Sequence, residues 1–134
     1  MIELKPVTEK DASFLYESLK ERTPTITISF KMPTIEEHEK FIKSKPYKAW
    51  YIITENSNPI GNVYLSKTDE IGIFILKKHQ GNKFGKRALD KIIMLHPRER
   101  YISNINPYNS KGEQFLINND FRLVQYTFVL DKKV

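Results

Sequence analysis

Several residue types are scarce in this chain of 134 residues, and their scarcity limits what the protein can be. Cysteine is absent, which excludes disulfide bonds, thiolate nucleophiles and zinc sites built on cysteine. The three histidines, His38, His79 and His96, lie far apart in the sequence, so we expect no metal site. No apolar run approaches the ~20 residues of a membrane span, and no secretory signal opens the chain. We therefore expect a cytoplasmic domain with no membrane partner.

The residues that are present indicate one folded domain over residues 1–134. Hydrophobic residues make up 40% of the chain and aromatic residues 12%, which argues against disorder. Lysine and arginine number 22 against 16 acidic residues, which gives a net charge of +6. This excess favours an anionic partner, such as nucleic acid, a phosphate-bearing cofactor or an acidic acceptor. The alternative is a lysine-rich surface that is simply solvated.

The hydrophobic pattern alternates between strand and helix periods along the chain. The Thr34 to Glu37 segment is a capping box and predicts the start of a helix, and Thr8 begins a weaker variant of the same motif. The expected strands cover residues 2–7, 50–53, 60–66, 70–76, 101–105 and 121–130, with helices after Thr8, after Thr34, over 84–96 and over 110–119. This order predicts a mixed sheet with helices on both faces.

The most informative segment for function lies between the most apolar strand and the best amphipathic helix. Residues 80–87 contain two glycines, Gly81 and Gly85, and three cations, Lys83, Lys86 and Arg87. Amides at a helix N-terminus have no partner within the helix and carry the positive end of its dipole. The segment therefore has the parts of a phosphate or pyrophosphate site, although Gly81 could also serve only to turn the chain.

The same segment resembles motif A of the GNAT superfamily of N-acetyltransferases, which reads Gln/Arg-x-x-Gly-x-Gly/Ala. Gln80 and Gly85 match its outer positions, Gly81 matches a common glycine, and Leu89 matches an apolar position of the helix. Lys83 stands at the middle glycine, where a lysine can donate its amide if its φ is negative.

A second segment resembles motif B of the superfamily, Asn-x-x-Ser followed by Gly-Phe. Asn109 and Phe121 are in register with it, whereas Gly112 replaces the usual serine and Asp120 the usual glycine. The Thr34 capping box, Pro33 and the strand pair 50–66 are similar to the RimJ/RimL-like branch. The resemblance covers nearly the whole chain and implies an α+β fold with a central mixed, twisted sheet of six to seven strands.

The resemblance also implies a cofactor, acetyl-CoA, and a primary amine as acceptor. In such proteins the pantetheine lies between two splayed central strands, which here places it along Ile73, Phe74 and Ile75. The pyrophosphate would lie over Gly81, Asn82, Lys83, Phe84, Gly85 and Lys86, with Gln80 beside them and Asn109 on the opposite wall. An amide near Phe74 or Ile75 would polarise the thioester carbonyl, which the amine attacks directly in a ternary complex.

Two side chains are candidates for proton transfer in that reaction. Glu70 occupies the strand position where some members of the superfamily have a catalytic glutamate, although a solvated carboxylate beside Asp69 is the alternative. The usual tyrosine of the motif B helix is absent, because Phe115 and Leu116 stand there. Tyr108, just before this helix, could substitute for it, or could be packing in a turn.

Three functions remain as hypotheses from the sequence. The first is an acetyl-CoA-dependent N-acetyltransferase whose acceptor pocket includes the threonine-rich segment 23–31. The second is a catalytically weak protein of the same fold that binds or senses CoA. The third is a basic nucleic-acid-binding domain, which only the net charge supports. After Phe121 the superfamily has two strands, and the segment 121–130 suffices for one, so a second subunit, as in a homodimer, could cover the exposed sheet edge.

Overall fold

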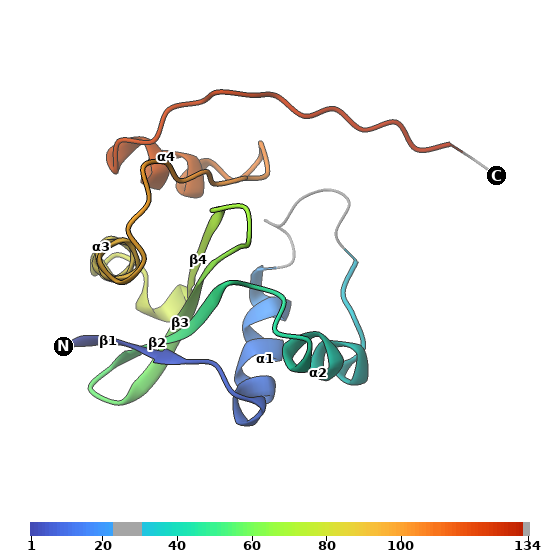
Figure 1. The fold of residues 1–134 in the computed structure, drawn as a ribbon, viewed down its shortest axis with the longest axis vertical. Helices are drawn as coiled ribbons and strands as arrows, with labels where there is room; N and C mark the ends of the chain where they lie inside the picture. Colours follow the sequence, from blue (N-terminus) through green and yellow to red (C-terminus); the bar gives the residue numbers. More distant parts are fainter. Residues whose placement is uncertain (23–30, 133–134) are drawn as a thin grey trace.

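The structure is a computed structural model that describes residues 1–22 and 31–132, and it places helices on both sides of a sheet (Figure 1). In chain order the elements are β1 (Ile2–Pro6), η1 (Glu9–Asp11), α1 (Ala12–Arg22), α2 (Ile35–Lys43), β2 (Ala49–Glu55), β3 (Asn58–Leu65), β4 (Ile71–Ile75), η3 (Lys77–His79), α3 (Phe84–Leu95) and α4 (Ser110–Asn118). The helices and the first four strands that the sequence predicts are therefore present in the expected order.

Strands β1 to β4 form one antiparallel sheet in the order β1-β2-β3-β4. A two-residue turn joins β2 to β3, and its residues Asn56 and Ser57 have φ values of 49° and 71°. Positive φ at both positions matches the right-handed twist of a hairpin. The register aligns Tyr51 with Val63 and Val63 with Ile73, so the apolar residues of three strands face the same side.

Each face of the sheet carries its own hydrophobic core. On one face α3 buries Phe84, Ala88, Leu89 and Ile92 against strand residues that include Ile53. On the opposite face α1 and α2 bury Ala12, Leu15 and Ile42 against Ile52. Because successive strand residues point to opposite faces, Ile52 and Ile53 serve the two cores separately. The expected coverage of both faces is thus confirmed (Figure 1).

Both predicted capping boxes are present. The amide of Glu37 donates to Thr34 Oγ1 at 3.1 Å, and the amide of Thr34 donates to Glu37 Oε1 at 2.8 Å. The second bond stabilises the carboxylate and lowers the pKa of Glu37. Thr8 and Asp11 make the corresponding bonds before α1. These bonds satisfy amides that a helix start leaves without partners.

The sheet is smaller than the sequence predicts. Four antiparallel strands are found among residues 1–22 and 31–132, rather than a mixed sheet of six to seven strands. The expected strand 101–105 makes a single parallel bridge, between Ile102 and Glu70. Ile71 N donates to Ile102 O at 2.8 Å and Ile102 N donates to Asp69 O at 3.1 Å, after which the segment leaves β4.

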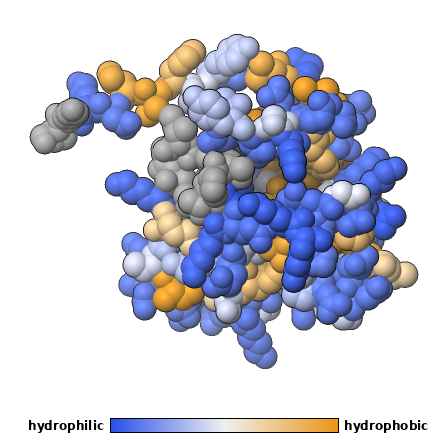
Figure 2. Space-filling model, turned by 180° about the vertical axis from the view of Figure 1, so that it is seen from behind, coloured by the Kyte–Doolittle hydropathy of each residue, from blue (hydrophilic) through white to orange (hydrophobic). Residues whose placement is uncertain are grey.

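The last expected strand, 121–130, is extended but pairs with none of the described residues. The chain leaves α4 through Asp120, which has a left-handed φ of 69°, and Phe121 N donates to Leu116 O at 3.0 Å. This exit carries the segment away from the sheet (Figure 1). Figure 2 shows hydrophobic residues on it, and the Phe128 side chain is 92% exposed.

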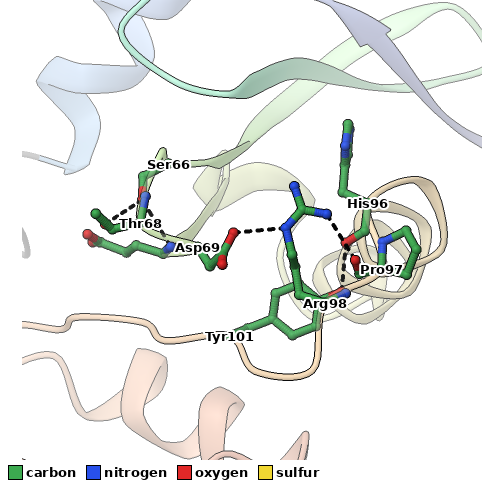
Figure 3. A network of polar contacts seen from close by, with 8 residues as sticks. Ser66, Thr68, Asp69, His96, Pro97, Arg98 and Tyr101 are labelled. Atoms are coloured by element: carbon green, nitrogen blue, oxygen red, sulfur yellow. Dashed lines mark hydrogen bonds and ion pairs between the residues drawn. The ribbon is translucent and has the colours of Figure 1, made fainter.

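A polar network joins the end of α3 to the turn between β3 and β4 (Figure 3). Arg98 Nε donates to Asp69 Oδ1 at 3.0 Å, and the Tyr101 hydroxyl donates to the carbonyl of His96 at 2.7 Å. The His96 ring itself bonds the Tyr51 hydroxyl at 2.7 Å. The network holds the segment before residue 102 against the start of β4, so it fixes where the two chain segments begin to separate.

Candidate functional site

The outer edge of β4 is the first feature of the candidate site. Even-numbered residues of β4 direct their backbone groups to β3. Glu70 and Leu76, the even-numbered residues on either side of β4, follow the same alternation, because each forms a backbone hydrogen bond at one end of the paired region. Odd-numbered residues therefore direct their amides and carbonyls away from β3. Ile71 uses both groups, on Ile102 and on Ser103 Oγ, and the Ile75 carbonyl accepts from Gln80 Nε2 at 2.9 Å.

Ile73 and the amide of Ile75 are thus the groups of this edge that remain open to a ligand among the described residues. Ile73 lines a cavity of about 370 Å³, here called the β4 cavity, between β4 and the segment 103–109. Of the two amides that the sequence indicates for polarising a carbonyl, that of Phe74 points to β3 and that of Ile75 points outward. Described residues lining the cavity include Glu70, Gly72, Ile73, Phe74, Ser103, Asn104, Asn106, Asn109 and Phe115.

The start of α3 is the second feature. The amides of residues 81–86 donate no hydrogen bond to any of the described residues. Gly81 has a φ of +87° and open space where a Cβ would stand. Lys83 has a φ of 62°, so the negative φ that would suit a lysine at this position is not found. The loop is therefore exposed, with its unpaired amides at the positive end of the helix dipole.

The other residues predicted for this loop have identifiable contacts. Gln80 links the loop to the end of β4, and Asn82 Nδ2 donates to the carbonyl of His79 at 3.3 Å. Phe84 is buried in the core under α3. A Cβ on Gly85 would lie 3.0 Å from the Phe115 ring, so a glycine permits α3 and α4 to approach. Lys86 forms an exposed ion pair with Asp90 at 3.3 Å.

Asn109 stands where α4 begins and also lines the β4 cavity. Its Oδ1 accepts from the amide of Gly112 at 3.0 Å, which caps the helix. The cap orients the side chain of a residue that lines the same cavity as Ile73. The role in cofactor binding that the resemblance implies for Asn109 stays a prediction.

A second cavity, of about 460 Å³, lies between the α1–α2 pair and the sheet, and we call it the aromatic cavity. Four aromatic side chains form much of its wall: Phe41, Tyr47, Trp50 and Tyr64. The Tyr47 and Tyr64 rings stack with centroids 3.9 Å apart, and the Trp50 ring meets Tyr47 edge-on at 4.9 Å. Trp50 Nε1 donates to Asn62 Oδ1 at 3.1 Å.

The two cavities share the lining residues Leu19, Arg22, Tyr47 and Tyr64. The Arg22 guanidinium lies 5.6 Å from the centroid of the Phe74 ring, a cation–π distance. Burial lowers the pKa of Arg22 and raises the pKa of both Tyr47 and Tyr64. The nearby Glu70 carboxylate raises the pKa of both tyrosines further, so both hydroxyls stay protonated and can donate hydrogen bonds.

The two predicted catalytic candidates, Glu70 and Tyr108, differ in their position relative to the cavities. Glu70 lines the β4 cavity and is partly buried; its amide donates to Ser66 Oγ at 2.9 Å. Tyr108 is 87% exposed and does not line either cavity. Sequence reasoning missed Arg22, Tyr47 and Tyr64, because only the fold brings α1, the loop before β2 and β3 together.

Three further predictions concern the acceptor pocket, metal sites and membrane-spanning helices. The segment 23–30, most of the expected acceptor pocket, lies outside the described residues, whereas Lys31 lines the aromatic cavity. In the described part of the chain there is no group of three or more side chains suited to a metal ion. Likewise, none of the described helices is long and apolar enough to cross a membrane.

Comparison with known proteins gives matches in structure but not in sequence. No family model matches the chain, and no curated protein matches it. Solved structures of acetyltransferases do match. One from Thermus thermophilus has a TM-score of 0.73 at 20% identity, covering 93% of this chain and 89% of that one.

Two further structures extend this result. RimL, a ribosomal L7/L12 α-N-protein acetyltransferase in complex with coenzyme A, has a TM-score of 0.72 at 15% identity, covering 92% of this chain and 81% of its own. An acetyltransferase of the GNAT family from Streptococcus pneumoniae has a TM-score of 0.69 at 16% identity, covering 99% and 94%. The chain therefore has the fold of the GNAT acetyltransferases, as the resemblance in its sequence predicts.

Proposed function

We propose that the protein is an acetyl-CoA-dependent N-acetyltransferase that moves an acetyl group to a primary amine by direct attack in a ternary complex. The observation that carries the proposal is the open edge of β4. Among the described residues, Ile73 presents an unpaired amide and carbonyl to a cavity that begins where β4 and the segment after residue 102 separate. The fold is that of RimL, whose structure contains coenzyme A.

The residues of this chain fit such a ligand in three places. Ile73 can pair with an amide group of the pantetheine as a neighbouring strand would, which leaves the amide of Ile75 for the thioester carbonyl. The unpaired amides of residues 81–86, with Lys83 and Lys86, suit the pyrophosphate. Asn109 holds the opposite wall of the β4 cavity, and Gln80 ties the loop to β4.

The chemical step needs positioning, one proton acceptor and stabilisation of an oxyanion. The thioester supplies an activated acetyl group and a thiolate leaving group. In our proposal the amide of Ile75 polarises the carbonyl, and Glu70 accepts the proton of the amine through water. Tyr64, with its protonated hydroxyl at the junction of the cavities, replaces the exposed Tyr108 as hydrogen-bond donor to the leaving sulfur.

Binding of CoA is the first test, measured as a rise in the unfolding temperature. Ligand at 100 times its Kd should stabilise the fold by about 2.7 kcal/mol. Lys83→Glu should weaken binding, because it places a carboxylate beside the pyrophosphate, whereas Lys43→Glu, an exposed lysine at the end of α2, should not. Equal stabilisation of both variants would contradict the proposed pyrophosphate site.

Release of free thiol from acetyl-CoA in the presence of amines tests the reaction itself. Glu70→Gln should lower turnover and change its pH profile; an unchanged profile would exclude Glu70 as the base. The exposed position of Tyr108 favours one alternative, a protein that binds CoA without efficient transfer. That alternative predicts stabilisation by CoA with no thiol release. Nucleic-acid binding predicts salt-sensitive retention on nucleic acid that CoA does not affect.

A further inference from the structure

We infer that the aromatic cavity binds the acceptor, and that this acceptor is a monoamine carried on a flat apolar group such as an aromatic ring. The inference rests on the proposed function, because it names the substrate class of the same site. The cavity of about 460 Å³ lies within the range of small-molecule sites. It shares Leu19, Arg22, Tyr47 and Tyr64 with the β4 cavity, so the two cavities adjoin, and in our proposal the amine of a bound molecule meets the thioester where they adjoin.

The wall of the cavity selects for a flat apolar body. Phe41 meets Trp50 edge-on at 5.9 Å and Tyr47 at 5.8 Å, which adds to the stacked tyrosine pair. Leu15, Leu19 and Pro33 complete the apolar lining. Aromatic rings favour edge-to-face and offset partners at these separations, so a further ring can extend the cluster.

The same wall disfavours an amino sugar. Its indole donor is already used, because Trp50 Nε1 bonds Asn62 Oδ1, and Tyr47 and Tyr64, whose hydroxyls can donate, line the side that it shares with the β4 cavity. A sugar brings several hydroxyls, and each hydroxyl that leaves water without a partner costs free energy. A ring with a single amine makes no such demand on the wall.

The charges disfavour a polyamine or a lysine-rich peptide. Two cations, Arg22 and Lys31, line the cavity. Glu37, the one carboxylate among the described lining residues, accepts the amide of Thr34 in the capping box. His38 also lines the cavity, and burial lowers its pKa, so it adds no charge at neutral pH. This environment repels several positive charges and favours the neutral, nucleophilic form of a single amine.

The chain provides its own reporter, because its one tryptophan, Trp50, stands in the cavity wall. We expect 2-phenylethylamine to change Trp50 fluorescence in a saturable way, without acetyl-CoA. In the thiol-release assay it should be used with a higher kcat/KM than spermidine or glucosamine. Phe41→Ala should weaken its binding by about three- to tenfold, the effect of losing one aromatic contact.

Ile35→Ala is the matched control, since Ile35 lies on the same helix with similar exposure, 37% against 42% for Phe41, and does not line the cavity. Its binding of 2-phenylethylamine should equal that of the unmodified chain. No change in Trp50 fluorescence, or a preference for spermidine, glucosamine or an acidic peptide, would overturn the inference. If acetyl-CoA still releases thiol with another amine in that case, the proposed function stands; if no amine releases thiol, the proposed function fails as well.

Discussion

Burial shifts the pKa of several side chains around the two cavities. It lowers the pKa of Arg22 and raises the pKa of Tyr47 and Tyr64, because the charged form of each group loses hydration when it is buried. His38 is the group for which this matters near neutral pH. Its side chain is 5% exposed, and its Nε2 has no hydrogen-bond partner in the part of the chain that the structure describes.

We predict that His38 makes the fold sensitive to acid. Burial lowers its pKa in the folded chain below the value of about 6.5 of the unfolded chain. Below pH 6.5 the unfolded chain therefore binds a proton that the folded chain does not, and the free energy of unfolding decreases as the pH is lowered. One such group contributes at most about 1.4 kcal/mol per pH unit to the free energy of unfolding. Denaturant unfolding between pH 7 and pH 5 measures this slope.

His38→Phe should remove this contribution, because the ring remains beside Tyr16, which it contacts at 5.5 Å, but cannot titrate. His79→Phe is the control, since it leaves His38 in place. The same pH slope in all three proteins would show that His38 is not the group responsible.

At the scale of elements, local signals in the sequence predict most of the fold. The Thr34 and Thr8 capping boxes mark where helices begin, because the motif itself supplies the bonds. Strand-like hydrophobic patterns predict β1 to β4, whose buried residues belong to the cores on the two faces of the sheet. Residues 101–105 and 121–130 carry the same strand pattern, yet neither forms a ladder among the described residues. The hydrophobic pattern indicates which residues suit a strand. Pairing also needs a neighbouring strand, and only the fold determines the position of that neighbour.

The same distinction separates the parts of the site. Glycine and charge at residues 80–87 indicate the loop, because the feature is continuous in sequence. Glu70 directly precedes β4, the strand that borders the cavity, so its position also follows locally. Arg22, Tyr47 and Tyr64 line the same cavity only because three separate segments of the chain pack together. No spacing within the sequence predicts that they are close.

The pairing of β3 with β4 positions the open edge, and Gly61 is required for it. A Cβ at this position would lie 2.1 Å from the carbonyl oxygen of Phe74 and 3.0 Å from Ile75 Cα. Both atoms are backbone, so a side-chain rotation cannot relieve the clash. Gly61→Ala should lower the free energy of unfolding by at least about 2 kcal/mol.

Denaturant unfolding measures this change, with Asn58→Ala as control because Asn58 is exposed in the same strand. The control should remain within about 0.5 kcal/mol of the unmodified chain. If Gly61→Ala is as stable as the control, then the close approach of β3 and β4 at this point is not required.

For the molecule as a whole, the segment 121–132 stands apart from the rest. It runs away from the sheet as an extended chain, and Tyr126, Phe128 and Leu130 are 76%, 92% and 82% exposed (Figures 1 and 2). An unpaired strand with apolar side chains is a site for pairing with another chain. The sequence hypothesis of a second subunit at this edge stays a prediction.

Limited digestion with chymotrypsin distinguishes the free segment from a covered one. If the segment is free, cleavage after Tyr126 or Phe128 should precede cleavage at the aromatic residues within the described helices and strands, because those aromatic residues are more buried and their backbones are bonded. Cleavage at these sites no faster than in the core would mean that the segment is paired in solution. Protection that disappears on dilution would identify the partner as a second copy of the chain, because only an intermolecular pairing depends on concentration.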